Sequence, residues 1–251
     1  MLNFKMKKVY VFFSTVVILM LHLPFAFSKS KSLQIIPLVA NVTKLDNIRA
    51  TGFSPMGLIY DSLKLNVLGL SHSAFDNAIK GFSYLKAKGK VFNSNIISIV
   101  DFTKPSSEKR LFIIDLENRK ILFNTYVAHG QNSGKAFANR FSNMPESFES
   151  SLGFYVTSNT YIGKNGFSMR LNGLEDGIND RADSRAIVMH GAPYVSEGFI
   201  RAKGYLGRSW GCPAVPEKMN KPIIEKIKNG TCLFIYSEDK NYLNFSKILN
   251  S

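Results

Sequence analysis

Two short segments contain residue types that serve covalent catalysis: a histidine before a glycine, and a cysteine in a glycine-rich turn. His190 follows the apolar run 187–189 and precedes Gly191, so its imidazole is expected at the margin of a sheet. Cys212 lies among small residues in the segment 207–215, a composition that favours a turn and a reachable sulfur. Because a free cysteine has a pKa of about 8.5, a thiolate at neutral pH needs a nearby base or cation. His190 and Cys212 are therefore a candidate nucleophile pair.

Two other polar residues near these segments allow more than one interpretation. His129 also precedes a glycine after a predicted strand, but no Gly-Cys segment follows it, so we expect a loop or cleft-lining residue. Ser209 is expected either to donate its hydroxyl to a substrate or to close the turn that carries Cys212.

The second cysteine, Cys232, leaves two chemical states open for Cys212. A disulfide between them is possible in an exported protein. However, Cys232 alternates with Phe234 and Tyr236 in an apolar strand, which favours a buried free thiol. A disulfide would also consume the candidate nucleophile, so we expect Cys212 to be free and catalytic.

The sequence gives no support for a metal or nucleotide cofactor. Two cysteines exclude a four-cysteine zinc site, and there is no glycine-rich phosphate-binding loop. One acidic loop lacks the spacing and the closing Glu of a calcium-binding loop, so we expect it to be solvated. Its polar residues are Asp176, Asn179, Asp180 and Asp183.

The order of the two segments resembles the L,D-transpeptidase (YkuD-like) family, whose catalytic domain cross-links bacterial peptidoglycan. Members carry His-Gly or His-Ser at a strand end and, a short distance later, Ser-His-Gly-Cys. The corresponding residues here are His190-Gly191 and Ser209-Trp210-Gly211-Cys212, and the cysteine stands 22 positions after the histidine.

The flanking sequence extends this resemblance over residues 95–237. The segment 151–156 is similar to the strand entry Thr-Pro-x-Gly-x-Phe, and the segment 230–235 to the closing strand Gly-Thr-x-Val-x-Ile. More narrowly, the chain resembles the branch of murein L,D-transpeptidase catalytic domain proteins, which read Ser-Trp-Gly-Cys-Pro-Ala and carry a helical layer before the domain.

Two positions depart from the family pattern. Trp210 stands in place of the usual His, and Ala214 stands where the family usually has Arg or Asn. That polar residue helps to organise the site, so its positive charge would have to come from elsewhere in the chain. Arg208 and Arg201 are the candidates.

The resemblance implies that His190 takes the proton of the Cys212 thiol and that the sulfur attacks a peptide carbonyl. The carbonyl of Gly191 would orient the imidazole, and the N–H groups of Gly211 and Cys212 would face the oxyanion. The candidates for further oxyanion or substrate contacts are Ser209, Arg208, Tyr194 and His129.

The implied substrate is a peptidoglycan stem peptide, which the enzyme would hold as a thioester after release of a terminal D-Ala. Attack by an amine would give a cross-link, and attack by water would make the protein an L,D-carboxypeptidase. A non-catalytic basic envelope-binding module with a structural Cys212 is a third possibility.

The first 28 residues have the pattern of a secretory signal peptide. Three lysines precede the apolar run 9–23, and the small residues Ala26 and Ser28 mark a cleavage site after Ser28. The run is shorter than the roughly 20 residues of a membrane-spanning helix, so a retained anchor is the second interpretation. Without a cysteine at the cleavage site, a lipoprotein is not expected. We therefore expect export to the periplasm or cell envelope, with the membrane as a partner only through an uncleaved leader.

The charge of the chain indicates an anionic partner. The 251 residues carry a net charge of +14, and 45 % of them are hydrophobic, which excludes disorder over the whole chain. Loss of the three leader lysines leaves +11 on the mature protein. An exported protein rarely meets nucleic acid, so peptidoglycan carboxylates and phospholipid headgroups are the expected anions.

The periodicity of apolar residues predicts a mostly β protein with a short helical layer before it. After a linker at 29–55, residues 56–90 are expected to form two helices, the second capped by Ser71 or Ser73. The catalytic domain at 95–237 is expected to be an L,D-transpeptidase-type β-sandwich with a helix at 221–228 capped by Asn220, and a C-terminal tail at 238–251 would follow. Its predicted strands are 96–100, 111–114, 121–127, 153–157, 185–189 and 232–236.

Overall fold

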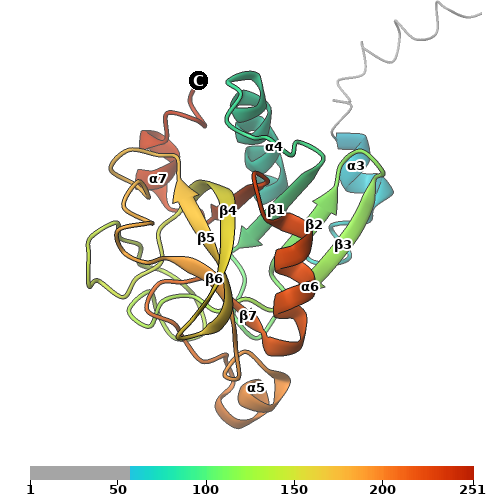
Figure 1. Ribbon diagram of the computed structural model, residues 1–251. Helices are drawn as coiled ribbons and strands as arrows, with labels where there is room; N and C mark the ends of the chain where they lie inside the picture. The colour runs from blue at the N-terminus through green and yellow to red at the C-terminus, as the bar shows by residue number, and fades with distance from the viewer. Residues whose placement is uncertain (1–56) are drawn as a thin grey trace, which may run out of the picture. The chain divides into compact units, whose positions relative to one another are not determined.

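The computed structural model describes residues 57–251, which are drawn in colour in Figure 1. The expected signal peptide and linker at 1–55 lie outside the described residues. No helix within 57–251 combines the length and apolar character that crossing a bilayer requires.

The described chain is mostly β, as predicted. Eight strands form one hydrogen-bonded sheet in the order β3-β2-β1-β8-β4-β5-β6-β7. The strands are β1 Ile96–Asp101, β2 Leu111–Asp115, β3 Lys120–Thr125, β4 Gly153–Gly163, β5 Gly166–Gly173, β6 Val188–Ala192, β7 Ala214–Pro216 and β8 Cys232–Tyr236. The helices are α3 Gly57–Ser62, α4 His72–Ala87, α5 Glu197–Lys203, α6 Glu217–Ile227 and α7 Lys240–Phe245.

The middle of the sheet is buried on both faces. Strand β8 pairs in parallel with β1 and antiparallel with β4, and every residue of β1 and β8 is buried. Helix α4 packs on these strands, capped by Ser71, whose hydroxyl accepts from the Ala74 N–H at 3.2 Å. A Cβ at Gly81 would lie 2.0 Å from the Phe154 ring, so glycine allows α4 to approach β4 closely.

The end of the sheet that carries the catalytic segments is built from β5, β6 and β7. Strand β6 pairs antiparallel with β5 and in parallel with β7, and His190 is the register partner of Ala214. The segment after β3 reaches the other side of β7 through a bridge between Ala128 and Ala214. Segments far apart in the chain therefore converge around β7.

Two predicted elements begin at other residues than expected. The strand predicted at 185–189 is β6, which starts at Val188 because Ala186 adopts a positive φ of 53° and the Ile187 N–H donates back to Ala182. His190 thus lies inside the strand and not at its end. The helix predicted at 221–228 is α6, which starts at Glu217, and the Asn220 side chain does not cap it but donates to the Phe167 carbonyl at 2.7 Å.

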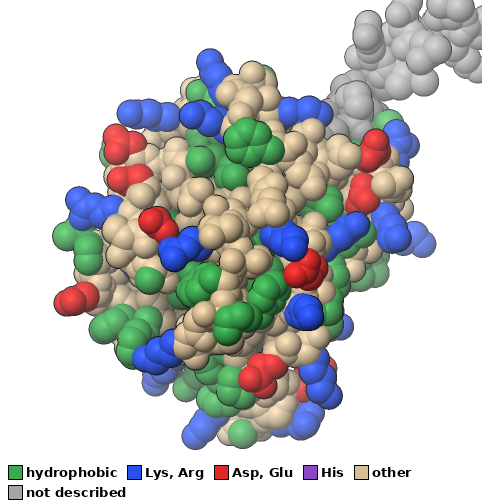
Figure 2. Space-filling view, in the orientation of Figure 1, with side chains coloured by type: hydrophobic (Ala, Val, Ile, Leu, Met, Phe, Trp, Pro, Cys, Tyr) green, Lys and Arg blue, Asp and Glu red, His purple; other side chains and the backbone are tan. Residues whose placement is uncertain are grey.

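The last residues of the chain pack against the domain. Helix α7 lies within 238–251, and Tyr242, Ile248 and Leu249 are buried in the main core. The buried carboxylate of Glu175 accepts hydrogen bonds from Tyr242 and Ser246 and from the Phe154 N–H. On the visible face, Lys and Arg side chains are widely spread, in keeping with the positive net charge (Figure 2).

Candidate active site

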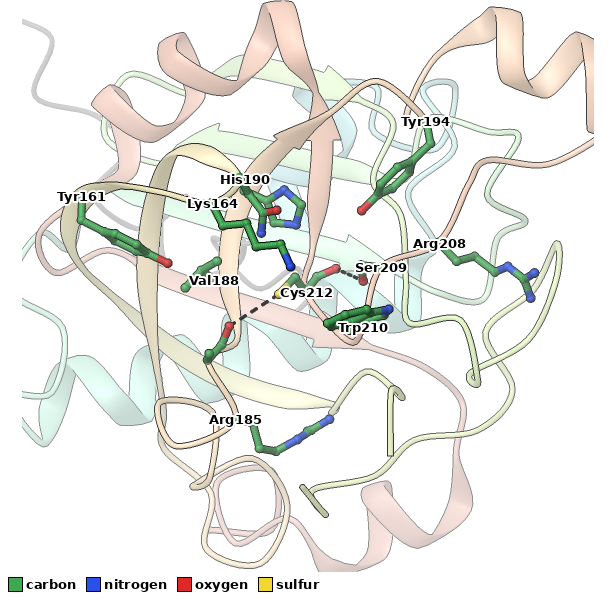
Figure 3. Close-up of a pocket in the computed structure, with 12 residues that line it drawn as sticks. Tyr161, Lys164, Arg185, Val188, His190, Tyr194, Arg208, Ser209, Trp210 and Cys212 are labelled. Atoms are coloured by element: carbon green, nitrogen blue, oxygen red, sulfur yellow. Dashed lines mark hydrogen bonds between the residues drawn. The ribbon is translucent and has the colours of Figure 1, made fainter. Parts of the chain in front are cut away.

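A cavity of about 430 Å³ brings Cys212 and His190 to one wall (Figure 3). Three stretches of chain line it: the end of β4 with the turn that follows, the segment from 185 into β6 and on to Tyr194, and the loop 208–212. Of the twelve described residues in the lining, three are Lys or Arg and none is Asp or Glu. The cavity is therefore suited to an anionic ligand.

The Cys212 thiol is free and almost buried, with 9 % of the residue exposed. Its sulfur donates to the Ala186 carbonyl at 3.7 Å. Burial raises the pKa of Cys212, and the Val188 backbone N–H and the Arg185 charge oppose that rise. Cys232 is also free and is fully buried in β8, which confirms the expected buried thiol and leaves no disulfide between the two cysteines.

The imidazole of His190 is held by the backbone of its own strand. Nδ1 lies 2.9 Å from the Gly191 carbonyl oxygen, so Nδ1–H donates and Nε2 keeps its lone pair. The residue is 5 % exposed, and burial lowers the pKa of His190 while the hydrogen bond to Gly191 opposes this. A neutral imidazole with an available Nε2 is a competent proton acceptor for a thiol.

The loop before Cys212 is closed by Ser209. The Ser209 hydroxyl donates to the Cys212 carbonyl at 2.6 Å and accepts from the Gly211 N–H at 3.1 Å. Ser209 therefore closes the turn, and the alternative that it donates to a substrate is not supported. The Gly211 N–H is likewise engaged within the loop, contrary to its expected place at the oxyanion. A glycine is required at 211 because φ is +119° and a Cβ would lie 2.7 Å from the Glu149 carbonyl oxygen.

Tyr194 directs its phenol group into the cavity (Figure 3). Burial and the proximity of Cys212 raise the pKa of Tyr194 to about 12. The phenol is thus protonated at neutral pH and can donate a hydrogen bond to a group bound beside Cys212.

Residues 67–236 match the family described as L,D-transpeptidase catalytic domain. The chain belongs to the L,D-transpeptidase catalytic domain family. No curated protein sequence matches it. Similar solved structures include an L,D-transpeptidase from Mycobacterium smegmatis, with 10 % identity, a TM-score of 0.36 and coverage of 57 % of this chain and 59 % of that one. Another is the helical cell shape determining protein Pgp2 from Campylobacter jejuni, with 15 % identity, a TM-score of 0.39 and coverage of 58 % and 48 %. The chain thus spans about half to three-fifths of the length of these structures.

Arg208 and Arg201 are the candidates to supply the positive charge that Ala214 lacks in this L,D-transpeptidase domain. Neither of them lies beside the thiol. Arg208 lines the cavity, but its guanidinium points away from Cys212 and donates to the carbonyls of Gln131 and Gly134 at 3.1 and 3.0 Å (Figure 3). Arg201 is 76 % exposed on α5 and pairs with Glu197.

His129 does not line the cavity of the L,D-transpeptidase domain, so the cleft-lining interpretation is wrong. Its side chain is fully buried, with Nδ1 2.7 Å from Arg110 Nη2 and Nε2 3.3 Å from the Gly134 carbonyl oxygen. Burial and the Arg110 charge lower the pKa of His129 to about 3. A neutral His129 therefore accepts a hydrogen bond from a buried arginine, which is a structural role.

The acidic loop is only partly solvated. Asn179 is fully buried and donates to the carbonyls of Leu152 and Phe154 at 2.9 and 3.1 Å, whereas Asp180 and Asp183 are exposed. Within residues 57–251, no group of three or more His, Cys, Asp or Glu side chains is arranged to hold a metal ion.

The lining also contains polar side chains that the sequence did not indicate as site residues, among them Tyr161, Lys164 and Arg185. Tyr161 lies near the end of β4 and Lys164 in the turn that follows, and the dipeptide Asn165-Gly166 indicates a hairpin there. Lys164 Nζ lies 5.4 Å from the ring centroid of Trp210, which is 63 % exposed at the rim. The sequence places Arg185 only in the predicted strand 185–189, and no local signal indicates that it reaches the cavity.

Proposed function

We propose that this protein is an exported cysteine acyltransferase that carries out L,D-transpeptidation on peptidoglycan stem peptides. The observation that carries the proposal is the shared cavity of Cys212 and His190, in which the Gly191 carbonyl holds Nδ1 and leaves Nε2 to accept a proton. Membership of the L,D-transpeptidase catalytic domain family supports the same chemistry.

In the first half-reaction, His190 Nε2 takes the thiol proton and the Cys212 sulfur attacks the peptide carbonyl carbon. The oxyanion is stabilised by the Tyr194 hydroxyl and the Cys212 N–H, and one such donor contributes on the order of 3 kcal/mol. The peptide C–N bond then breaks, and the departing D-Ala nitrogen takes the proton from His190. The acyl group remains on Cys212 as a thioester.

In the second half-reaction, a side-chain amine of a neighbouring stem peptide attacks the thioester. His190 removes a proton from that amine, a new amide bond forms, and the C–S bond breaks. The sulfur regains a proton from His190, so the site returns to its starting state without any oxidant, metal or nucleotide.

The charge of the cavity supports a carboxylate-bearing substrate. Lys164, Arg185 and Arg208 are the charged residues of its described lining. Lys164 stands over the exposed Trp210 at the rim, where it can pair with a carboxylate of the stem peptide. The leader at 1–28 supports delivery to the envelope, where this polymer lies.

Hydrolysis of the same thioester is the second candidate outcome, because water can replace the amine at an open cavity. Mass analysis of products separates the two. The mature protein is incubated with tetrapeptide muropeptides, and a cross-linked dimer with release of D-Ala is expected. A tripeptide without dimer would identify a carboxypeptidase, and unchanged muropeptides would favour a non-catalytic binding module.

A further inference from the structure

We propose that Arg185 is the positioning residue that supplies the positive charge beside Cys212 and holds the loop 142–151 behind it. The proposal deepens the proposed function, since it names the group that replaces the polar side chain absent at Ala214. It starts from the side chains around Ala214, which is fully buried among Ala128, Ala192 and Val195. Strand β7 therefore contributes no charge to the site.

The guanidinium of Arg185 lies directly against the residue that precedes the nucleophile. A Cβ at residue 211 would lie 3.3 Å from Arg185 Nη2, and Arg185 lines the same cavity as Cys212. A cation in the same cavity wall as a thiol favours the thiolate over the neutral form. Burial of Cys212 disfavours the thiolate, so the nearby charge acts against the main obstacle to its ionisation.

The same guanidinium fixes one loop through four hydrogen bonds. Nη1 donates to the Ser142 carbonyl at 2.8 Å and to the Ser151 hydroxyl at 2.6 Å. Nη2 donates to the Ser147 hydroxyl at 3.1 Å and to the Glu149 carbonyl at 2.7 Å. These bonds span 34 to 43 residues of sequence and occupy all four Nη protons, so Arg185 acts through its charge and its position.

The loop held in this way is strained and supports the cysteine loop. Glu146 and Phe148 adopt positive φ values of 58° and 53°, a conformation that costs free energy in residues other than glycine. The Ser150 hydroxyl donates to the Gly211 carbonyl at 3.3 Å, and the Phe148 ring lies 5.4 Å from that of Trp210. The hydrogen bonds of Arg185 compensate the strain, and the loop in turn fixes the backbone beside Cys212.

The test is the pH dependence of iodoacetamide alkylation of Cys212 in the full mature protein, followed by mass spectrometry. Other groups at the cavity also titrate or carry charge, and they are the same in every variant compared except at the mutated position. They are His190, Tyr161, Tyr194, Lys164 and Arg208. Cys232 is fully buried and serves as an internal reference for unfolding.

Arg185→Gln removes the charge and is expected to raise the thiol pKa by about one unit, which slows alkylation at neutral pH about tenfold. Arg185→Lys keeps the charge but has fewer donors, so the thiol pKa should stay near the parent value while hydrogen exchange in 142–151 becomes faster. Arg208→Met is the matched control, since it removes a guanidinium of the same cavity that points elsewhere, and it should leave the thiol pKa unchanged.

An unchanged thiol pKa in Arg185→Gln, or an equal rise in Arg208→Met, would overturn the proposal. If Arg185→Gln does not fold, the lysine variant still decides, because a raised thiol pKa with the charge retained contradicts the role assigned to that charge. The assay needs no muropeptide, so it can support the role of Arg185 even if the protein has no transpeptidase activity. Conversely, the enzyme could be active while the Cys212 thiol of Arg185→Gln titrates as in the parent. That result would refute the role of Arg185 and leave the proposed function standing.

Discussion

His190 Nδ1 lies 2.9 Å from the carbonyl oxygen of Gly191, the next residue of β6. The peptide group after Gly191 therefore selects the tautomer of the imidazole, a task that a carboxylate performs in Ser-His-Asp triads. A Cβ at Gly191 would lie 3.0 Å from the Asn220 Cβ, so α6 packs tightly against this peptide group and limits its movement. The orientation of the proposed base is thus set by the contact between β6 and α6.

The two cysteines should respond differently to replacement by serine. Cys212→Ser should abolish acyl transfer and leave the fold intact, because a hydroxyl is a much weaker nucleophile at this site. Cys232→Ser should keep activity and lose about 1–3 kcal/mol of stability, because it places an unpaired hydroxyl in an apolar strand. Muropeptide turnover and thermal unfolding measure the two effects. Loss of activity in the Cys232 variant without loss of stability would contradict these roles.

Replacement of the two histidines that precede glycine should also have different effects. His190→Ala should lower the acylation rate by several orders of magnitude, as loss of the base does in comparable sites. His129→Ala should leave the Cys212 thiol pKa unchanged but cost about 1–3 kcal/mol, because Arg110 loses a buried acceptor. Alkylation rates against pH and denaturant unfolding provide the measurements. If the thiol pKa rises in His129→Ala and not in His190→Ala, the base is His129 and the role given to His190 is wrong.

Glu175 should make the free energy of unfolding depend on pH. Burial raises the pKa of Glu175 above its ordinary value, although hydrogen bonds from Ser246, Phe154 and Tyr242 oppose this. Its contribution is fully present below the ordinary pKa of about 4.3 and is lost as the pH rises through the raised value of the folded state. Urea unfolding at several pH values should show a decline over this window that is absent in Glu175→Gln. If the free energy of unfolding declines equally in the parent and in Glu175→Gln, the decline comes from another group.

Export should remove the leader. The charged start, the apolar run 9–23 and the small residues before position 29 predict cleavage after Ser28. N-terminal sequencing of the protein from its native host should begin at Lys29. A chain that begins at Met1 and is extracted only by detergent would instead be an anchored enzyme.

Several features could be predicted from local sequence alone, because their causes lie within a few residues. Helix α4 has apolar residues at helical spacing and Ser71 as its cap, and the continuous apolar runs of β1 and β8 suit strands buried on both faces. The pattern His190-Gly191 with Ser209-Trp210-Gly211-Cys212 is enough to indicate the family and both proposed catalytic side chains.

Other features were decided by contacts between distant segments. Arg185 lies beside Gly211 because its guanidinium is bound to the loop 142–151. Burial, together with the charge of the neighbouring Arg110, lowers the pKa of His129 and keeps it neutral. Ser209 faces its own turn and Asn220 faces β5, although local sequence favours other roles for both. Burial and hydrogen-bond partners depend on which segments the sheet brings together, and that arrangement is a property of the whole fold.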